Sequence, residues 1–205
     1  KEEKTATYIH IALDKKYLGY ILVADEIKKG VDETIKALKE LGVSKTVMLT
    51  GDHKGRAEEV ARKAGIDQFH GQLLPQDKVS ILEEYKSKIK GKGKIVFVGD
   101  GINDAPVLAG ADIGIAMGGI GSDAAIEAAD VVLMNDDIAL LATAIRIARK
   151  TRRIVVQNII FALATKILIM ILAFAGITSI WFAIFADVGV ALIALMNALR
   201  VLKNH

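Results

Sequence analysis

The 205-residue sequence predicts an α/β domain built on a doubly wound parallel sheet, followed by a two-helix transmembrane hairpin. Three observations support this fold class. Short apolar runs alternate with amphipathic segments over most of the chain, two long apolar runs follow them, and charge is spread unevenly. The chain has 27 basic and 24 acidic residues, and only four of them lie in residues 154–205. The first part is therefore expected to face water and the last part lipid.

The overall composition excludes several classes of protein. With 52% hydrophobic residues, 25% charged residues and no cysteine, the chain is neither a disordered tail nor a disulfide scaffold, and it holds no thiolate metal site or cysteine nucleophile. A net charge of +3 is too small to indicate nucleic-acid binding, so no nucleic-acid partner is expected. No apolar run follows the charged residues 1–4, so they are not expected to be a signal peptide. The sequence is instead expected to begin partway through a longer protein.

The first 145 residues alternate between strand-like and helix-like segments. Residues 7–13 and 17–24 are β-branched and aromatic runs joined by a short polar turn, which predicts a β-hairpin. Beyond them, helices are expected over residues 31–41, 56–64, 76–89 and 122–129, and strands over residues 46–49, 95–98, 113–117 and 131–134. Near-continuous apolar strands that alternate with helices indicate a parallel sheet covered on both faces.

A single long helix is expected from Ile138 to Ala175. At ~1.5 Å per residue it is nearly 60 Å long, roughly twice the ~30 Å core of a bilayer, so its first half must stand outside the membrane. The two spans are predicted at about 154–175 and 180–199, with a turn at 176–179. A buried helical hairpin of a soluble protein is the alternative interpretation.

Basic residues flank the two predicted spans. They are Arg146, Arg149, Lys150, Arg152, Arg153, Arg200 and Lys203. The positive-inside rule then places the soluble part and both ends of the hairpin in the cytoplasm, and Trp181 serves as an interfacial anchor on the far side.

Polar residues follow two of the predicted strands where each strand ends. Ligands of open α/β sheets bind beyond the carboxyl ends of the strands. Asp100 and Asp104, across a glycine turn that opens a helix, can bring two carboxylates to one Mg²⁺ ion. The hydroxyl of Thr50, the amide of Asn103 and the ammonium of Lys78 would complete a cradle for a transferring phosphoryl group.

The segments around these residues closely resemble the phosphorylation domain of P-type ATPases, which are members of the haloacid dehalogenase-like superfamily. The resemblance is carried by Thr50-Gly51-Asp52, Leu74-Pro75-Gln76-Asp77-Lys78, Gly99-Asp100-Gly101-Ile102-Asn103-Asp104-Ala105-Pro106 and Ala111-Asp112-Ile113-Gly114-Ile115-Ala116-Met117-Gly118.

The resemblance implies ATP and Mg²⁺ as cofactors and a catalytic set made of Thr50, Gly51, Asp52, Lys78, Asn103 and Asp104. In this set Thr50 and Lys78 contact the aspartyl phosphate, Asp100 binds Mg²⁺, and Asn103 and Asp104 support the phosphate and the metal. Asp25 matches the hinge aspartate between the nucleotide and phosphorylation domains. Asp52 has an alternative interpretation as a helix N-cap.

One part of the family pattern is missing. The phosphorylated aspartate of the family lies in an Asp-Lys-Thr-Gly-Thr motif, and no such motif occurs in this sequence. Asp14-Lys15 resembles it only in two letters and is expected to be a hairpin turn. The resemblance therefore implies a C-terminal piece of a larger pump, with the tail of a nucleotide domain at 1–24 and the phosphorylation domain at 25–145. Residues 146–205 then form a cytoplasmic helix extension and the last two spans, and the piece alone should not hydrolyse ATP.

Lys166 and Asp187 form a second candidate site, inside the predicted membrane segment. Lys166 lies 10 residues before Gly176 and Asp187 lies 8 residues after Ser179, so both sit at a similar depth. Charges near the bilayer centre usually pair or line a pathway. The pair is either a structural ion pair or a transport site in which Asp187 offers oxygen ligands to a divalent cation and Lys166 holds the carboxylate.

The membrane part also resembles a particular subgroup of P-type ATPases, the exporters of zinc, cadmium and lead. The resemblance is carried by residues 157–166, Trp181, Ala186-Asp187-Val188-Gly189 and Met196-Asn197-Ala198-Leu199-Arg200. It implies Zn²⁺, Cd²⁺ or Pb²⁺ as the transported cation, a location in the plasma (inner) membrane, and the rest of the pump as a partner. A soluble haloacid dehalogenase-like phosphatase and a non-catalytic membrane fragment are the alternatives.

Overall fold

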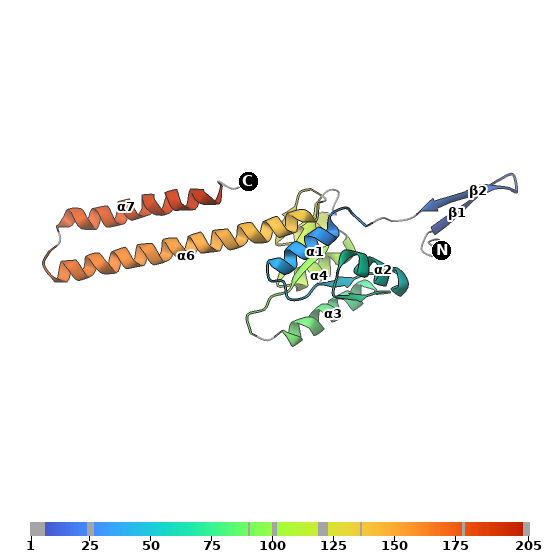
Figure 1. Ribbon diagram of the computed structural model, residues 1–205, viewed down its shortest axis with the longest axis horizontal. Coiled ribbons are helices and arrows are strands. Elements are labelled where there is room, and N and C mark those ends of the chain that lie inside the picture. Colours follow the sequence, from blue (N-terminus) through green and yellow to red (C-terminus); the bar gives the residue numbers. More distant parts are fainter. Residues whose placement is uncertain are drawn as a thin grey trace. The chain divides into compact units, whose positions relative to one another are not determined.

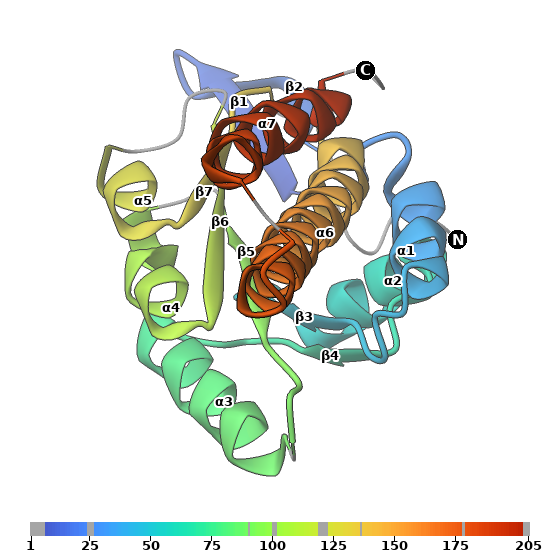
Figure 2. The ribbon, with the colours of Figure 1, turned by 90° about the vertical axis from the view of Figure 1, so that its left-hand side faces the viewer.

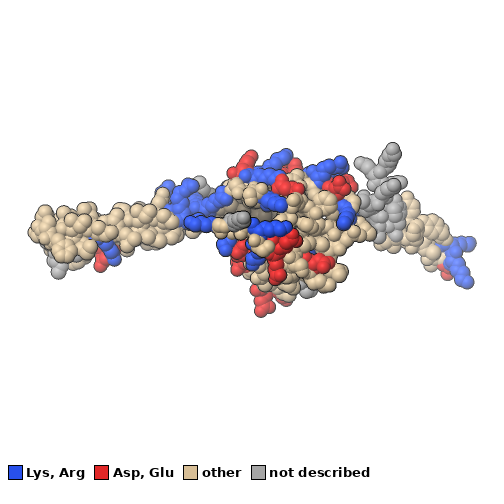
Figure 3. Space-filling view, turned by 90° about the horizontal axis from the view of Figure 1, so that it is seen from below, with Lys and Arg blue, Asp and Glu red and all other residues tan. Residues whose placement is uncertain are grey.

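The computed structural model describes residues 7–23, 27–89, 91–99, 102–118, 123–135, 137–177 and 179–202. They form two compact units, Lys1–Ala142 and Thr143–His205. Most charged side chains lie on the first unit, whereas the surface of the second is almost uncharged along most of its length (Figure 3). The uneven charge of the sequence therefore corresponds to two structurally separate units.

The chain begins with the expected β-hairpin. Strand β1 (Thr7–Leu13) pairs antiparallel with β2 (Lys16–Val23), and the register shifts between Ile11 and Ala12. Asp14 and Lys15 form the turn with φ angles of 48° and 64°, so both adopt the left-handed conformation that two-residue hairpin turns require. The turn is one residue shorter than predicted because Lys16 already belongs to β2.

Helices and strands then alternate through the rest of the first unit. In chain order they are α1 (Val31–Glu40), β3 (Val47–Leu49), α2 (Lys54–Ala64), β4 (Gln68–His70), α3 (Pro75–Lys88), β5 (Val96–Gly99), the 3₁₀ turn η2 (Ile102–Asp104), α4 (Ala105–Gly110), β6 (Ile113–Met117), α5 (Asp123–Ala128) and β7 (Val131–Leu133). The predicted helices and strands are confirmed, with bounds that differ by one or two residues. Strand β4 was not predicted.

The strands of this unit form two parallel ladders. Strand β3 pairs with β4, and β5, β6 and β7 pair in that order. Figure 2 shows α3, α4 and α5 on one side of these strands and α1 and α2 on the other, which is the doubly wound arrangement that the sequence predicts. Among the described strands, no ladder joins β3–β4 to β5–β6–β7.

Helix α4 provides the tightest packing of the first unit. Its residues Val107 and Leu108 are completely buried. The adjoining strand β6 approaches closely because it has a glycine there: a Cβ added at Gly114 would lie 2.5 Å from the carbonyl oxygen of Leu108. This close contact fixes α4, and with it the η2 turn at the end of β5, against the sheet.

The second unit is a helical hairpin. Helix α6 (Ala139–Phe174) is unbroken over 36 residues, and α7 (Ile180–Ala198) continues into the 3₁₀ turn η3 (Leu199–Val201). Gly176, with φ 72°, lies between the helices (Figure 1). Two helical stretches, Ala139–Phe174 and Ile184–Val201, are long and apolar enough to cross a membrane, and 18-residue windows within them have mean hydropathies of 2.2 and 1.8. The long helix and the two predicted spans are thus confirmed as helices.

Candidate functional site

Thr50 lies directly after β3 and is fixed by three hydrogen bonds. Its backbone N–H donates to the carbonyl of His70 (3.0 Å), and its carbonyl accepts from the N–H of Leu73 (3.1 Å). Its hydroxyl oxygen accepts from the backbone N–H of Asp52 at 3.1 Å. The loop after β4 therefore fixes Thr50 at the carboxyl end of β3, where the sequence places it.

Asp52 is not the N-cap of the following helix, so that alternative interpretation is wrong. Helix α2 begins at Lys54 and its N-cap residue is His53, whose side chain makes no capping hydrogen bond. Asp52 lies one residue too early, because its carbonyl accepts from the N–H of Gln72 (2.8 Å) and holds it in the preceding loop. Its carboxylate is 55% exposed and lies 3.8 Å from Nε of Arg56. Gly51, between Thr50 and Asp52, is also exposed.

Lys78 and Asp104 form the closest charged contact at this edge of the sheet. The Nζ atom of Lys78 donates to Oδ1 of Asp104 at 2.6 Å, and their side chains are only 16% and 14% exposed. Lys78 is in the first turn of α3, which starts after Leu74, whose N–H donates to the carboxylate of Asp77 at 2.9 Å. A short charge-assisted hydrogen bond shielded from water is much stronger than one at the surface. It connects the β4–α3 segment to the β5–α4 segment.

Three further predicted residues are Asn103, Asp100 and Asp25. Asn103 precedes Asp104 in η2, and its side chain is exposed. Asp100, the predicted Mg²⁺ ligand, and Asp25, the predicted hinge, lie outside the described residues. Within the described part of the chain, no group of three or more histidine, aspartate and glutamate side chains could hold a metal ion. The Mg²⁺ site therefore stays a prediction.

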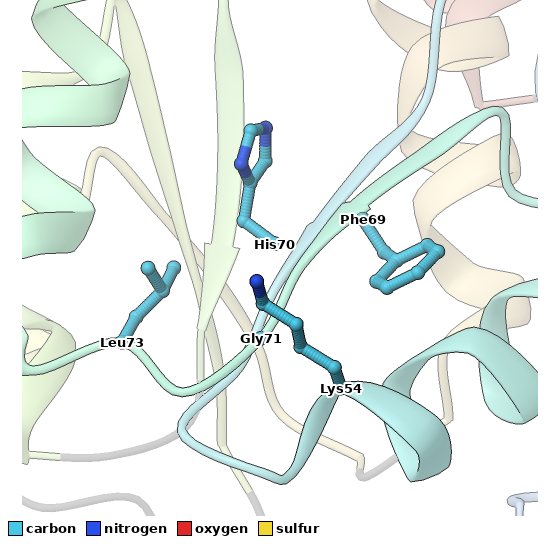
Figure 4. A pocket seen from close by; sticks show the side chains of 5 residues that line it. All are labelled: Lys54, Phe69, His70, Gly71 and Leu73. Carbon is cyan, nitrogen blue, oxygen red and sulfur yellow. The ribbon is translucent and has the colours of Figure 1, made fainter.

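A pocket of about 440 Å³ lies next to Thr50, and sequence analysis did not identify it. Its lining residues are Lys54, Phe69, His70, Gly71 and Leu73. Figure 4 shows Lys54 and His70 extending toward the same space, while Phe69 points to the other side of β4. The cationic side chain of Lys54 favours an anionic group in the pocket. Residues 68–70 contain one apolar residue, so no periodic pattern signals this strand.

A tyrosine holds the ring of His70. The hydroxyl of Tyr85 donates to Oε1 of Gln68 at 2.7 Å, and it lies 3.2 Å from Nε2 of His70. Since that hydroxyl has only one proton to donate, it accepts from Nε2 of His70.

Carboxylates fix the opposite edge of the sheet. Lys39 and the backbone and hydroxyl groups of Thr46 hydrogen-bond to Asp67, and these contacts lower the pKa of Asp67 to about 2. Asp112 has a similar place before β6: hydrogen bonds from the backbone of Ile95 and from Lys94 lower its pKa below the ordinary value. These hydrogen bonds fix the amino ends of the strands and occupy the carboxylates there. The charges that are available for a ligand therefore lie at the carboxyl ends.

The second candidate site lies in the helical hairpin. Lys166 of α6 and Asp187 of α7 lie 3.5 Å apart, from Nζ to Oδ1, so the two charges meet at one depth. Their side chains are 63% and 75% exposed, and the pair therefore lies on the surface of the hairpin and not between the helices.

Comparison with known proteins covers both units. A sequence model of the haloacid dehalogenase-like hydrolases matches residues 1–112. A cadmium, zinc and cobalt-transporting ATPase of Bacillus subtilis is 52% identical over 98% of this chain. A zinc-transporting ATPase of Synechocystis is 56% identical over 96% of it. The crystal structure of a zinc-transporting PIB-type ATPase in its E2.Pi state superimposes on 97% of the chain with a TM-score of 0.83 and 36% identity.

The similarity extends over only part of these relatives. The chain spans 29% of the Bacillus protein, 27% of the Synechocystis protein and 32% of the crystallised chain. Since the alignments include nearly all of this chain, they include both the Lys78–Asp104 contact and the Lys166–Asp187 pair.

Proposed function

Because the chain belongs to the haloacid dehalogenase-like hydrolase family and its close relatives are cadmium- and zinc-transporting P-type ATPases, we propose that it is part of an ATP-driven heavy-metal exporter. One observation carries the proposal. A buried Lys78–Asp104 contact in the charged unit and a Lys166–Asp187 pair in the apolar unit occur in one chain, and the match to the transporting relatives extends over nearly the whole of that chain. The proposed cargo is a divalent cation, Zn²⁺, Cd²⁺ or Pb²⁺, which is substrate and not cofactor.

In the soluble unit, Thr50, Lys78 and Asn103 are the proposed ligands of the phosphoryl group. The ammonium of Lys78 is already oriented by Asp104, so it can stabilise the charge of a phosphate without a large rearrangement. Gly51 and Asp52 complete the loop that presents the Thr50 hydroxyl. This arrangement is suited to phosphoryl transfer, in which positioning and charge stabilisation provide most of the catalysis.

Mg²⁺ and ATP are the proposed cofactors. Oδ1 of Asp104 accepts from Lys78, so Oδ2 is left as an oxygen donor. Asp100 comes directly after β5 in the sequence, and its carboxylate is the second proposed ligand. Carboxylate oxygens fit a hard cation such as Mg²⁺. When bound, the ion would neutralise charge on the phosphoryl oxygens.

The nucleophilic aspartate is proposed to come from a segment outside these 205 residues. The sequence contains no Asp-Lys-Thr-Gly-Thr motif. Among the described strands, β3 pairs only with β4 and β5 only with β6, so each has one edge available for pairing. A parallel strand added there would end near Thr50 and Asp104. Alone, the chain is therefore proposed to be inactive.

The N-terminal hairpin is proposed to be the tail of a nucleotide-binding domain. Its apolar side chains Ile9, Leu18 and Ile21 are 50%, 64% and 52% exposed. A two-stranded hairpin with such exposure is marginal in water and needs a further partner. The proposed domains remain 1–24 for this tail, 25–145 for the phosphorylation domain and 146–205 for the membrane part.

In the membrane part, Asp187 is the proposed cation ligand and Lys166 its counter-charge. Their exposure on the hairpin is too costly in contact with lipid tails, so we propose that upstream spans of the pump cover this face. The basic residues before the first span and after the second support an orientation with both ends in the cytoplasm, and the proposed location is the plasma (inner) membrane.

Complementation tests the proposal. The chain is co-expressed with a separately encoded upstream part of a related pump, and zinc-dependent phosphoenzyme formation from ATP is measured in membranes. We expect phosphoenzyme only when both parts are present, and none with Asp100→Asn. Zinc-dependent ATP hydrolysis by the chain alone would refute the proposal that the nucleophile lies outside these 205 residues. Failure of the combined parts to form phosphoenzyme would refute the proposal that the chain is part of a pump.

A further inference from the structure

A continuous chain of hydrogen bonds joins the two membrane helices near one end of the hairpin. The Nη1 atom of Arg200 donates to Oδ1 of Asn197 (2.9 Å), and Nδ2 of Asn197 donates to Oδ1 of Asn158 (2.7 Å). The Nδ2 atom of Asn158 then donates to the carbonyl oxygen of Ala194 at 3.0 Å. Each amide accepts through oxygen and donates through nitrogen, so all three bonds form at once. We call Asn158, Asn197 and Arg200 the asparagine clasp.

The two asparagines lie in the contact seam between the helices. Both side chains are half-buried, and the hairpin also buries Ile154 on α6 and Ala186 and Val190 on α7. Thr165 is also half-buried on α6, but its hydroxyl donates to the carbonyl of Phe161 in its own helix (2.9 Å). Among the described residues of the hairpin, only the clasp makes hydrogen bonds from one helix to the other.

The clasp and the ion pair fit the same register. From Asn158 to Lys166 is eight residues along α6, and from Asn197 back to Asp187 is ten residues along α7. These separations correspond to about 12 and 15 Å. The helices run in opposite directions, so the clasp and the ion pair fit one register if these two separations are similar. They differ by two residues. A slip of one helical turn, about 5.4 Å, would move Asp187 out of reach of Lys166.

Apolar packing alone gives weak control over that slip. Between the clasp and the ion pair, the buried and half-buried residues are Ala162 and Thr165 on α6 and Gly189, Val190 and Ala194 on α7, and such small side chains offer similar contacts one turn later. Paired amide hydrogen bonds are directional and are lost by a slip, and a buried asparagine is known to specify register in helix pairs. The hydrogen bonds therefore distinguish the observed register from the neighbouring ones.

We propose that the asparagine clasp sets the register of α7 on α6 and thereby places Asp187 beside Lys166. Asn158 and Asn197 are positioning residues for the membrane site and contact neither charge. The consequence for transport rests on the proposed function, whereas the register does not.

Cysteine cross-linking tests the register in the full 205-residue chain reconstituted in lipid nanodiscs. The chain has no cysteine of its own, so each introduced pair is unique. The pair Lys166→Cys with Asp187→Cys reports the observed register, and Lys166→Cys with Ala191→Cys reports a slip of one turn. The first pair also removes the ion pair, which leaves the clasp as the polar contact that holds the register.

With the clasp intact, the 166/187 pair should cross-link much more than the 166/191 pair. Adding Asn158→Leu and Asn197→Leu should change the ratio of the two products roughly fivefold to tenfold toward the slipped pair, as expected for the loss of two interhelical hydrogen bonds. Thr165→Val is the matched control, since it removes a seam hydroxyl that does not join the helices, and it should leave the ratio unchanged. An unchanged ratio in the double leucine variant, or an equal change with Thr165→Val, overturns the proposal.

The functional arm uses the complemented pump. Asn158→Leu with Asn197→Leu, in the presence of Lys166 and Asp187, should raise the zinc concentration for half-maximal turnover more than it lowers kcat. If the cross-linking ratio changes while this concentration does not, the role of the clasp in positioning the site is wrong. If the unaltered complemented pump shows no zinc-stimulated turnover, the proposed function fails, and the cross-linking result still decides the register.

Discussion

The Lys78–Asp104 contact leads to a quantitative prediction for the stability of the first unit. We consider the cycle formed by Lys78→Met, Asp104→Asn and the double variant. The charged groups are 2.6 Å apart and about 85% shielded from water, with exposures of 16% and 14%. A charge-assisted hydrogen bond of this kind contributes about 1.5–3 kcal/mol. Each single variant leaves the opposite charge largely buried, so the double variant should lose less stability than the sum of the single ones.

The expected coupling energy is about 2 kcal/mol. It is measured by urea unfolding of the full chain in detergent micelles, followed by hydrogen exchange of the backbone amides of β5 and β6. Lys63→Met and Glu59→Gln form the control cycle, since that pair has a similar separation of 2.7 Å but exposures of 61% and 40%. Its coupling should be much smaller, because water screens an exposed ion pair. Equal coupling in the two cycles would show that burial does not strengthen the contact, and the reasoning would be refuted.

Three further predictions follow from other contacts. Folding lowers the pKa of Asp67 from 3.8 to about 2, so the unfolded chain takes up the proton first as the pH falls. The stability of the folded chain should therefore fall as the pH drops from about 4 toward 2. In the variant Asp67→Asn, the urea midpoint should depend less on pH over this range. Gly114→Ala should destabilise the first unit, because the new Cβ would lie 2.5 Å from the carbonyl oxygen of Leu108. The control is Gly55→Ala in helix α2, where a new Cβ meets no atom within 4 Å. In the same unfolding assay this control should be neutral or stabilising by up to about 1 kcal/mol. Asp187→Ala in the complemented pump should abolish zinc-stimulated turnover, and undiminished turnover would exclude Asp187 as a cation ligand.

The sequence predicts the long elements well because their signals extend over many residues. The helix expected from Ile138 to Ala175 is observed from Ala139 to Phe174, because no glycine or proline interrupts this stretch. Strand β4 could not be predicted. It has three residues and one apolar side chain, and it exists because β3 pairs with it and because Asp67 holds its amino end, which are both tertiary effects.

Residues of the site were predictable, but their contacts were not. The rule that ligands bind beyond the carboxyl ends of parallel strands identifies Thr50 and Asp104 from the sequence alone. Lys78 was expected to contact phosphate, and its observed partner is Asp104, 26 residues away. That contact depends on the orientation of the first turn of α3. The clasp between Asn158 and Asn197 depends in the same way on the register of two helices, which residue types do not reveal.

The two lysine–aspartate pairs differ in how completely this chain surrounds them. Lys78 and Asp104 are 16% and 14% exposed, so the first unit already supplies most of the environment of its pair. Lys166 and Asp187 are 63% and 75% exposed on the hairpin. Two charges that lipid cannot solvate require further protein around them. Since the relatives are more than three times as long as this chain, they have the additional chain that this environment requires. The first unit can therefore preorganise the proposed phosphate site by itself, whereas the proposed cation site of the second unit requires additional protein around its two charges.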